Sequence, residues 1–366
     1  MVTKKNLYIV IMAGGRGERF WPVSRVSRPK QFVSIFGGKP LIKIAVERLD
    51  GLVEPEQILV ITSDDLVELS RETLPMLPAE NIIGEPFGRD TAAACALGMA
   101  WVAGRGGDSA TMAVLTADHL IEDVPVFLQT LADASDIAAR EDTIGTIGIV
   151  PEYPATGYGY IEAGEQLESD SKTEFIRIKR FVEKPDLETA KEYVSAGNYY
   201  WNSGMFIWSV KTFKDALREF CPQLFEMTER MKDKFGGTDF AAILLEEYSK
   251  LDRISIDYAV MEKAKNIVAA RGAFGWDDVG TWVSAGEHLK CDDAGNALHG
   301  KSEVLKATGN TIVNDVDGHL VAVMGADDLV VVHTADATLV CTKESAQDLK
   351  EIVKQISDNN KNISFT

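Results

Sequence analysis

Short apolar runs alternate with segments of helical spacing over residues 7–150, and this alternation constrains the fold more than any other feature of the sequence. The apolar runs occupy residues 7–12, 58–62, 111–116 and 143–150, and the helix-spaced segments include residues 41–49, 92–102 and 127–139. Such alternation predicts buried strands joined by helices, which form a mostly parallel sheet covered on both faces. We therefore expect an α/β, Rossmann-like fold that binds its ligands at the carboxyl ends of the strands.

The pattern changes twice after residue 157. Polar-alternating strands are expected at residues 158–162, 175–183 and 203–208, with a short helix at 187–196, and they predict an antiparallel insertion over the sheet that would serve as a lid. Residues 213–251 have helical spacing. Four short β-rich runs at 311–313, 320–324, 329–333 and 338–341 predict a small β-helix-like or sandwich domain, closed by an amphipathic helix at 346–356. We expect a catalytic domain at 1–290 and a C-terminal β-rich domain at 291–366.

Charge and cysteine content narrow the functional class. The formal net charge of −18 would repel a phosphate backbone over the whole surface, which argues against general nucleic-acid binding. No apolar run approaches the roughly 20 residues that cross a bilayer, so we expect no membrane partner. The run at 7–12 leads into glycines and charges instead of a cleavage site, and the four cysteines form no CxxC pair. These features predict a cytoplasmic protein with reduced thiols.

The segment after the first apolar run is rich in glycine and arginine. Gly14, Gly15 and Gly17 would let backbone amides approach a polyphosphate without obstruction by a Cβ. Five cations follow within fifteen residues, namely Arg16, Arg19, Arg25, Arg28 and Lys30. The segment lacks the third glycine of a dinucleotide fold and the GxxxxGK[ST] of a P-loop. The alternative interpretation of the glycines alone is a tight turn with solvated arginines.

The whole run, GGRGERFWPVSR followed by PKQF, resembles the signature of the sugar-nucleotide pyrophosphorylases in their mannose form. Further blocks resemble that family in order along the chain, at residues 85–91, 117–119, 156–160, 181–185, 201–204, 255–258 and 276–280. The resemblance implies an enzyme that joins GTP and mannose 1-phosphate into GDP-mannose and diphosphate, with Mg²⁺ as cofactor.

The resemblance also implies roles for individual residues. The triphosphate would lie on Gly14, Gly15 and Gly17, with Arg16 and Lys30 neutralising it and Arg19 as a further contact. The nucleotide pocket would include Glu85, Arg89 and Thr91. The sugar would be bound by Gly157, Gly159, Glu183 and Asn202, with Lys184 meeting its phosphate. Asp118, which follows the strand at 111–116, and Asp278 would ligate Mg²⁺, because carboxylate oxygens suit that hard cation. Arg25 and Arg28 remain open between phosphate binding and a role in orienting the loop.

Two positions depart from the family pattern, and several alternatives stay open. Asp90 stands where relatives often carry Asn, and Thr116 where they often carry Pro. The chain could use another nucleoside triphosphate and hexose 1-phosphate, or act as a non-catalytic regulatory protein that binds sugar nucleotides. We expect no isomerase activity, because no segment corresponds to the additional cupin domain of longer relatives. The β-rich tail could form homodimer contacts or cover the nucleotide cleft.

Overall fold

The computed structural model of the protein describes residues 3–15, 17–359 and 363–366, which form two compact units. Unit 1 comprises Met1–Gly14, Val46–Thr116 and Ile121–Trp276, and unit 2 comprises Gly15–Ala45, Ala117–Leu120 and Asp277–Thr366. The units follow spatial contacts and not chain order, so unit 2 takes in most of the glycine-rich segment. The domain boundary at residue 290 stays a prediction.

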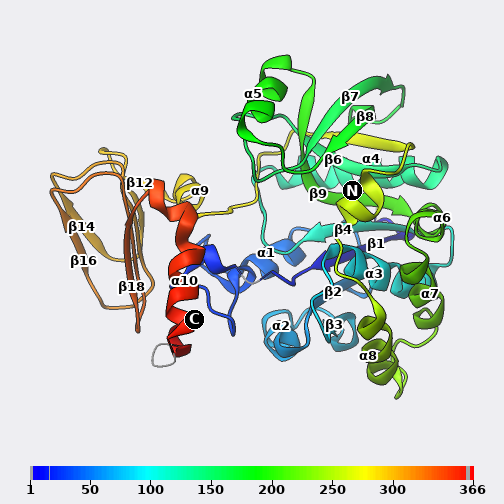
Figure 1. Ribbon diagram of the computed structural model, residues 1–366, viewed down its shortest axis with the longest axis horizontal. Helices are drawn as coiled ribbons and strands as arrows, with labels where there is room; N and C mark the ends of the chain where they lie inside the picture. The colour runs from blue at the N-terminus through cyan, green and yellow to red at the C-terminus, as the bar shows by residue number, and fades with distance from the viewer. Residues whose placement is uncertain (1–2, 16, 360–362) are drawn as a thin grey trace. The chain divides into compact units, whose positions relative to one another are not determined.

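The described part of unit 1 contains a nine-stranded sheet in the order β3-β2-β1-β4-β9-β6-β10-β8-β7 (Figure 1). Its strands are β1 (Leu7–Met12), β2 (Ile58–Ser63), β3 (Ile82–Glu85), β4 (Thr111–Thr116), β6 (Ile144–Ile149), β7 (Tyr160–Leu167), β8 (Phe175–Val182), β9 (Tyr199–Ser209) and β10 (Ile267–Gly272). β1 pairs in parallel with β2 and β4, β2 with β3, and β6 with β10. The predicted α/β class is therefore confirmed.

β9 enters the middle of this sheet as an antiparallel strand. It lies between β4 and β6, with Met112 opposite Trp208 and Gly145 opposite Ile207, and its first residues also pair with β7. β7 and β8 continue the same sheet through the β8–β10 pairing. The prediction that these strands form an insertion over the sheet was wrong. The polar alternation marks their exposed face, and their hydrogen bonds extend the main sheet.

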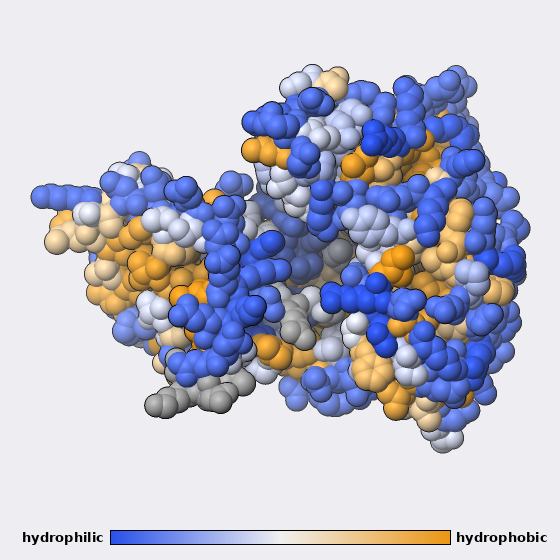
Figure 2. Space-filling model, in the orientation of Figure 1, coloured by the Kyte–Doolittle hydropathy of each residue, from blue (hydrophilic) through white to orange (hydrophobic). Residues whose placement is uncertain are grey.

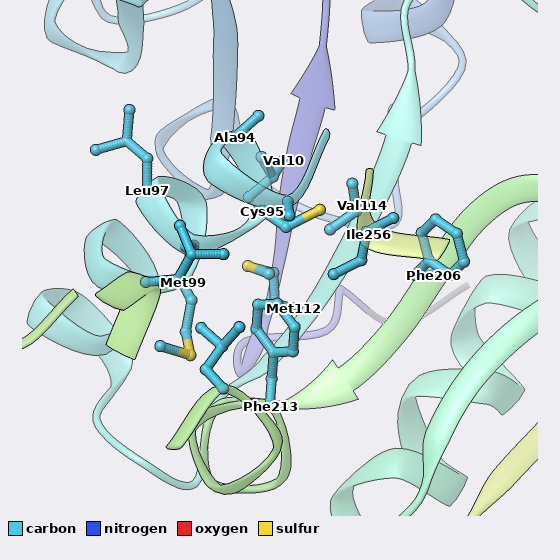
Figure 3. Packing of buried hydrophobic residues seen from close by; sticks show 14 of the residues in the cluster. Val10, Ala94, Cys95, Leu97, Met99, Met112, Val114, Phe206, Phe213 and Ile256 are labelled. Carbon is cyan, nitrogen blue, oxygen red and sulfur yellow. The ribbon is translucent and has the colours of Figure 1, made fainter. Parts of the chain in front are cut away.

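The helices of unit 1 are α2 (Val67–Thr73), α3 (Thr91–Gly106), α4 (Val124–Arg140), α5 (Leu187–Ala196), α6 (Val210–Phe220), α7 (Pro222–Met231) and α8 (Phe240–Lys250). α3 is buried from residue 92 to residue 102 because it packs against the sheet and also against α6 and α7. A Cβ on Gly98 would lie 2.8 Å from both methyl groups of Val10, so only glycine allows this approach. Figure 3 shows the resulting core, with Val10, Met112 and Val114 of the strands packed around Cys95 of α3.

The described part of unit 2 contains stacked β-strands. β13 (Ala297–His299), β15 (Thr311–Asn314) and β17 (Leu329–His333) pair in parallel, and so do β14 (Ser302–Leu305) and β16 (Val321–Met324). β12 (Lys290–Cys291) and β18 (Thr338–Thr342) add antiparallel edges. Parallel strands that repeat along the chain form the predicted β-helix-like domain. Further elements of the described chain are α1 (Leu41–Glu47), β5 (Leu120–Ile121), β11 (Trp276–Asp277), α9 (Trp282–Glu287) and α10 (Leu349–Asp358).

Two asparagines connect successive turns of these strands. Asn310 is fully buried, and its amide donates 2.8 Å to Asn296 Oδ1 and 2.9 Å to the Ala326 carbonyl, while its Oδ1 accepts from the Leu329 N–H. Asn296, also fully buried, donates to the Ala307 carbonyl. Stacked side-chain amides thus satisfy backbone groups that the turns leave without ladder partners.

The glycine-rich segment and the C-terminal strands share one apolar core. Phe20 and Trp21 are buried with Trp282, Val330 and other residues of the tail, and the Trp282 indole donates to the Trp21 carbonyl. Figure 2 shows apolar side chains gathered on the visible face of the β-rich region. Leu305 and Met324, opposite each other in β14 and β16, are 58% and 72% exposed. Within the described residues, no helix is long and apolar enough to cross a membrane.

Candidate functional site

Gly17 brings the glycine-rich loop into contact with Lys30. Its φ is +61°, in the left-handed region, and an added Cβ would lie 2.6 Å from the Lys30 amide nitrogen. The Ser24 hydroxyl donates 2.7 Å to the Gly17 carbonyl and holds the turn from the other side. Glycine is therefore required at this position for both its conformation and its lack of a side chain.

The Lys30 ammonium joins the two predicted metal-binding aspartates. Lys30 is 6% exposed, its Nζ lies 2.9 Å from Asp118 Oδ2, and it also donates to the Asp278 carbonyl oxygen. Burial raises the pKa of the Asp118 carboxyl, but the nearby charges of Lys30 and His119 outweigh burial, and the pKa lies below its ordinary value. Asp118 is thus an anion, and the buried Lys30 connects it to Asp278 within unit 2.

The two adjacent aspartates at 277 and 278 have different surroundings. The Asp277 carboxylate accepts from the Val279 N–H at 2.6 Å, and its Oδ2 lies 2.7 Å from His288 Nε2. Burial raises the pKa of Asp277, but these two interactions outweigh burial, and the pKa lies below its ordinary value. Val279 has a φ of +47°, an uncommon value for a β-branched residue, so Asp277 stabilises a strained turn. The Asp278 carboxylate lies over Gly280, where an added Cβ would be 3.1 Å from its Oδ1.

The residues around Lys30 suit a hard cation only with ligands from a substrate or water. In the described part of the chain, no group of three or more His, Cys, Asp or Glu side chains is arranged to hold a metal by itself. Asp118 and Asp278 would therefore supply a minority of the ligands, which is the usual arrangement for Mg²⁺ bound with phosphates.

The other predicted triphosphate contacts lie in the same loop. Arg16 falls outside the described residues, and Arg19 is exposed in the short helix Glu18–Phe20. Gly14 and Gly15 are exposed. An added Cβ on Gly15 would have no described atom within 4 Å, and one on Gly14 would lie 3.6 Å from Glu85 Oε2. The loop backbone is therefore accessible, and its binding role stays a prediction.

Gly159, Glu183 and Asn202, three of the predicted sugar contacts, lie together in unit 1. A Cβ on Gly159 would lie 2.6 Å from Glu183 Oε2 and 3.5 Å from the Asn202 Cβ. Glu183 is 9% exposed and accepts 2.7 Å from the Lys184 ammonium, whose residue has a φ of +46°. Around Gly157, by contrast, no described atom would be within 4 Å of an added Cβ. The positive φ of Lys184 is a strained conformation, and such conformations are frequent at binding sites.

Asp257 is the residue of this cluster that the sequence analysis did not single out. Its Oδ1 accepts 3.1 Å from the Asn202 amide, and Asn202 Oδ1 lies 2.9 Å from the Thr146 hydroxyl. Burial first, and then the charge of Glu183, raise the pKa of Asp257 to about 7. The signal for it was present in the Ser255–Tyr258 block, but nothing in that pattern pointed to one of its residues.

The predicted nucleotide contacts Glu85, Arg89 and Thr91 make intramolecular bonds. Glu85 accepts 3.1 Å from the Tyr248 hydroxyl, and burial raises its pKa to about 7 despite that bond. Arg89 Nε donates 2.9 Å to the Tyr248 carbonyl, and the Thr91 hydroxyl accepts from the Ile256 N–H at 2.9 Å. These bonds hold the last turn of α8 and the chain that follows it, and nucleotide binding by these three residues stays a prediction.

The Asp90 departure has a local structural explanation. Asp90 has a φ of +67° and caps α3, with its carboxylate accepting from the Thr91 N–H at 2.9 Å. Both Asp and Asn suit helix N-caps and tolerate positive φ better than other side chains. The capping role therefore survives the exchange of Asn for Asp.

Comparison with known proteins agrees with this arrangement. Residues 8–291 match the family described as nucleotidyl transferase, and residues 302–356 match the MannoseP isomerase/GMP-like beta-helix domain. The mannose-1-phosphate guanylyltransferase of Klebsiella pneumoniae is 41% identical over 353 residues, which cover 96% of this chain and 74% of that protein. The Escherichia coli enzyme of the same name is 40% identical with the same coverage.

A solved structure extends the likeness to three dimensions. The Thermus thermophilus protein named mannose-1-phosphate geranyltransferase is 36% identical, with a TM-score of 0.86 over 96% of this chain and 99% of that chain. Identity at this level over nearly the whole chain covers both the region that matches the nucleotidyl transferase family and the β-rich tail. The chain belongs to the nucleotidyl transferase family and, within it, to the mannose-1-phosphate guanylyltransferases.

Proposed function

We propose that this protein transfers GMP from GTP to mannose 1-phosphate, with release of diphosphate. The observation that carries the proposal is the buried Lys30 ammonium, which joins the Asp118 carboxylate to the Asp278 backbone within a chain of this family. A buried, fixed cation is suited to nucleotidyl transfer between anions, because such catalysis depends mainly on positioning and on stabilising negative charge.

The proposed reaction needs no general base. A phosphate monoester has a second pKa of about 6, so the sugar phosphate is largely dianionic at neutral pH. One of its oxygens attacks the α-phosphorus of GTP and a new P–O bond forms. The bond from that phosphorus to the oxygen bridging to the β-phosphate breaks, and its electrons leave with diphosphate.

Positive charge is the main contribution of the protein, because both reactants are anions. In our proposal Arg16 and Lys30 neutralise the triphosphate, and Lys184 meets the sugar phosphate. A fixed guanidinium or ammonium attracts an anion more strongly in a buried setting than in water. Of the described side chains Lys30 and Lys184, Lys30 is the more buried. Holding the reactants in line supplies the rest of the rate enhancement.

We propose Mg²⁺ as the divalent cation of this reaction, held by Asp118 and Asp278. The hard carboxylate oxygens and the small number of protein ligands fit Mg²⁺, which keeps waters and binds substrate phosphates. Bound there, it would supply charge neutralisation for the phosphates. Lys30 keeps Asp118 ionised and in place for that role.

The remaining parts of the proposal concern binding and setting. The nucleotide would contact Gly14, Gly15, Gly17, Arg19, Glu85, Arg89 and Thr91, and the sugar would contact Gly157, Gly159, Glu183 and Asn202. We propose that the chemistry belongs to residues 1–290, that the protein acts in the cytoplasm and that the exposed apolar strands of the tail form homodimer contacts. The partners are small molecules, with no nucleic acid.

The test is diphosphate release from a panel of nucleoside triphosphates, each with mannose 1-phosphate or glucose 1-phosphate and Mg²⁺. The proposal expects release with GTP and mannose 1-phosphate, and a loss of at least about 100-fold in Asp278→Ala. A matched control is Asp252→Ala, an exposed aspartate outside the site. Faster diphosphate release with another pair would overturn the named substrates. No diphosphate release with any pair would overturn the proposed activity.

A further inference from the structure

Asp257 lies at the start of an uncommon turn that follows a buried, hydrogen-bonded residue. Residues Asp257–Met261 form a π turn in which the Glu262 N–H donates 2.9 Å to the Asp257 carbonyl. Ile256 is fully buried, and Figure 3 shows it beside Val114 and Phe206 in the core. Its N–H is bonded to the Thr91 hydroxyl. Single π turns are rare in proteins, and those that occur are often found at functional sites.

The Asn202 amide orients the Asp257 carboxylate. Asn202 is 8% exposed, its backbone N–H donates 2.8 Å to the Gly159 carbonyl, and its side chain spans from Thr146 to Asp257. The amide therefore already uses its oxygen and one of its N–H groups within the protein. It is better placed to position Asp257 than to be the main recognition group for a ligand.

Asp257 and Glu183 form a pair of acidic groups with one lysine. The Lys184 ammonium is bonded to Glu183, and it also acts electrostatically on Asp257. Burial first, and then the charges of Glu183 and Asp90, disfavour the ionised form of Asp257 and raise its pKa to about 7. Glu183 lies beside Gly159, and Asp257 is bonded to Asn202, whose Cβ also lies near Gly159. The two carboxyl groups offer several acceptor oxygens, and sugar hydroxyls are neutral donors that can use them without adding charge.

We propose that Asp257 is a specificity-determining residue that accepts hydrogen bonds from hydroxyls of the sugar phosphate, and that Asn202 is the residue that positions it. The inference rests on the proposed function and assigns the main stereochemical selection to the pair Glu183 and Asp257. A site built to accept from a particular hydroxyl rejects the epimer strongly, because its buried acceptor then remains unpaired.

The test compares Asp257→Asn with Asp252→Asn, an exposed aspartate five positions earlier that serves as the matched control. Kinetics with the preferred nucleotide would be measured for mannose 1-phosphate and glucose 1-phosphate, and calorimetry would measure binding of mannose 1-phosphate. We expect Asp257→Asn to raise KM and Kd for mannose 1-phosphate by about 10- to 100-fold, with KM for the nucleotide within about twofold of the wild type. The ratio of kcat/KM between the two sugar phosphates should fall about tenfold, and the control should change none of these.

Asn202→Ala tests the positioning role. It should reproduce part of the loss of selectivity, and the double variant with Asp257→Asn should lose less than the sum of the two single effects, because both act through one carboxylate. A lower thermal stability with unchanged Kd and unchanged sugar selectivity would make Asp257 structural only and overturn the inference. Failure of the proposed function would appear separately, as a wild-type protein that neither turns over nor binds mannose 1-phosphate.

Discussion

Gly17→Ala should inactivate the protein through Lys30 while leaving the fold in place. The new methyl group would collide with the Lys30 Cβ and lie 2.6 Å from the Lys30 amide nitrogen, whereas ordinary contacts begin at 3.4 Å, so the backbone must move by at least about 0.8 Å. A misplacement of about 1 Å can cost about 100-fold in rate, and we expect kcat/KM to fall by about that factor, or about 2.7 kcal/mol. The left-handed conformation adds a stability cost of about 1–2 kcal/mol.

Gly37→Ala is the matched control because it separates conformation from collision. Gly37 has a φ of +68°, close to the +61° of Gly17, and no described atom lies within 4 Å of an added Cβ. The control should lose the same 1–2 kcal/mol or so of unfolding free energy and keep its turnover. Initial rates of diphosphate release and chemical denaturation would be measured for both variants. Equal activity in the two variants would refute the argument that Gly17 acts by making room for Lys30.

Three further variants test other parts of the structure. Asn310→Ala should lower the free energy of unfolding by about 2–4 kcal/mol in urea denaturation, because it leaves buried backbone groups unpaired; a loss under about 0.5 kcal/mol would count against the asparagine stack. The pKa of Glu85, raised to about 7, means that its contribution to stability is complete below its unfolded pKa of 4.5 and is lost as pH rises through 7. Glu85→Gln should therefore gain a few kcal/mol relative to the wild type between pH 5 and pH 8, and a pH-independent difference would contradict the assignment. Asp277→Asn should lose about 1–3 kcal/mol of unfolding free energy, because it weakens the bonds to Val279 and His288. Its activity should still depend on divalent metal, whereas that of Asp278→Asn should not. Loss of metal dependence in Asp277→Asn would exchange the two roles.

Local sequence patterns were sufficient for most of the elements. The runs predicted at 7–12 and 111–116 coincide with β1 and β4, and the helix predicted at 187–196 coincides with α5. Periodicity succeeds there because each run is short, apolar and bounded by turn residues. The long helical pattern at 213–251 is divided into α6, α7 and α8, with Pro222 at the first position of α7. Proline favours that position, but spacing alone does not show where one helix ends and the next begins.

Some site residues could also be found from the sequence, and others only from the structure. Motifs brought Lys30, Asp118 and Asp278 to attention, and the structure places Lys30 in contact with both aspartates. Asp257 was not singled out, because its importance comes from a hydrogen bond to Asn202 across 55 positions of the chain. A long-range contact leaves no periodic trace in either segment.

The sequence by itself determined the α/β class and the β-rich tail, because these depend on local spacing, and it determined the family through the resemblance of its motif blocks. Only the tertiary structure decided that β9 lies inside the sheet between β4 and β6, since strand pairing depends on register between distant segments. It also decided that Phe20, Trp21 and Phe36 pack with the tail, because the partner of an apolar face is chosen by shape and not by sequence distance. The assignment of Asp277 to a structural bond and of Asp278 to Lys30 has the same origin, since two adjacent aspartates differ only in what surrounds them.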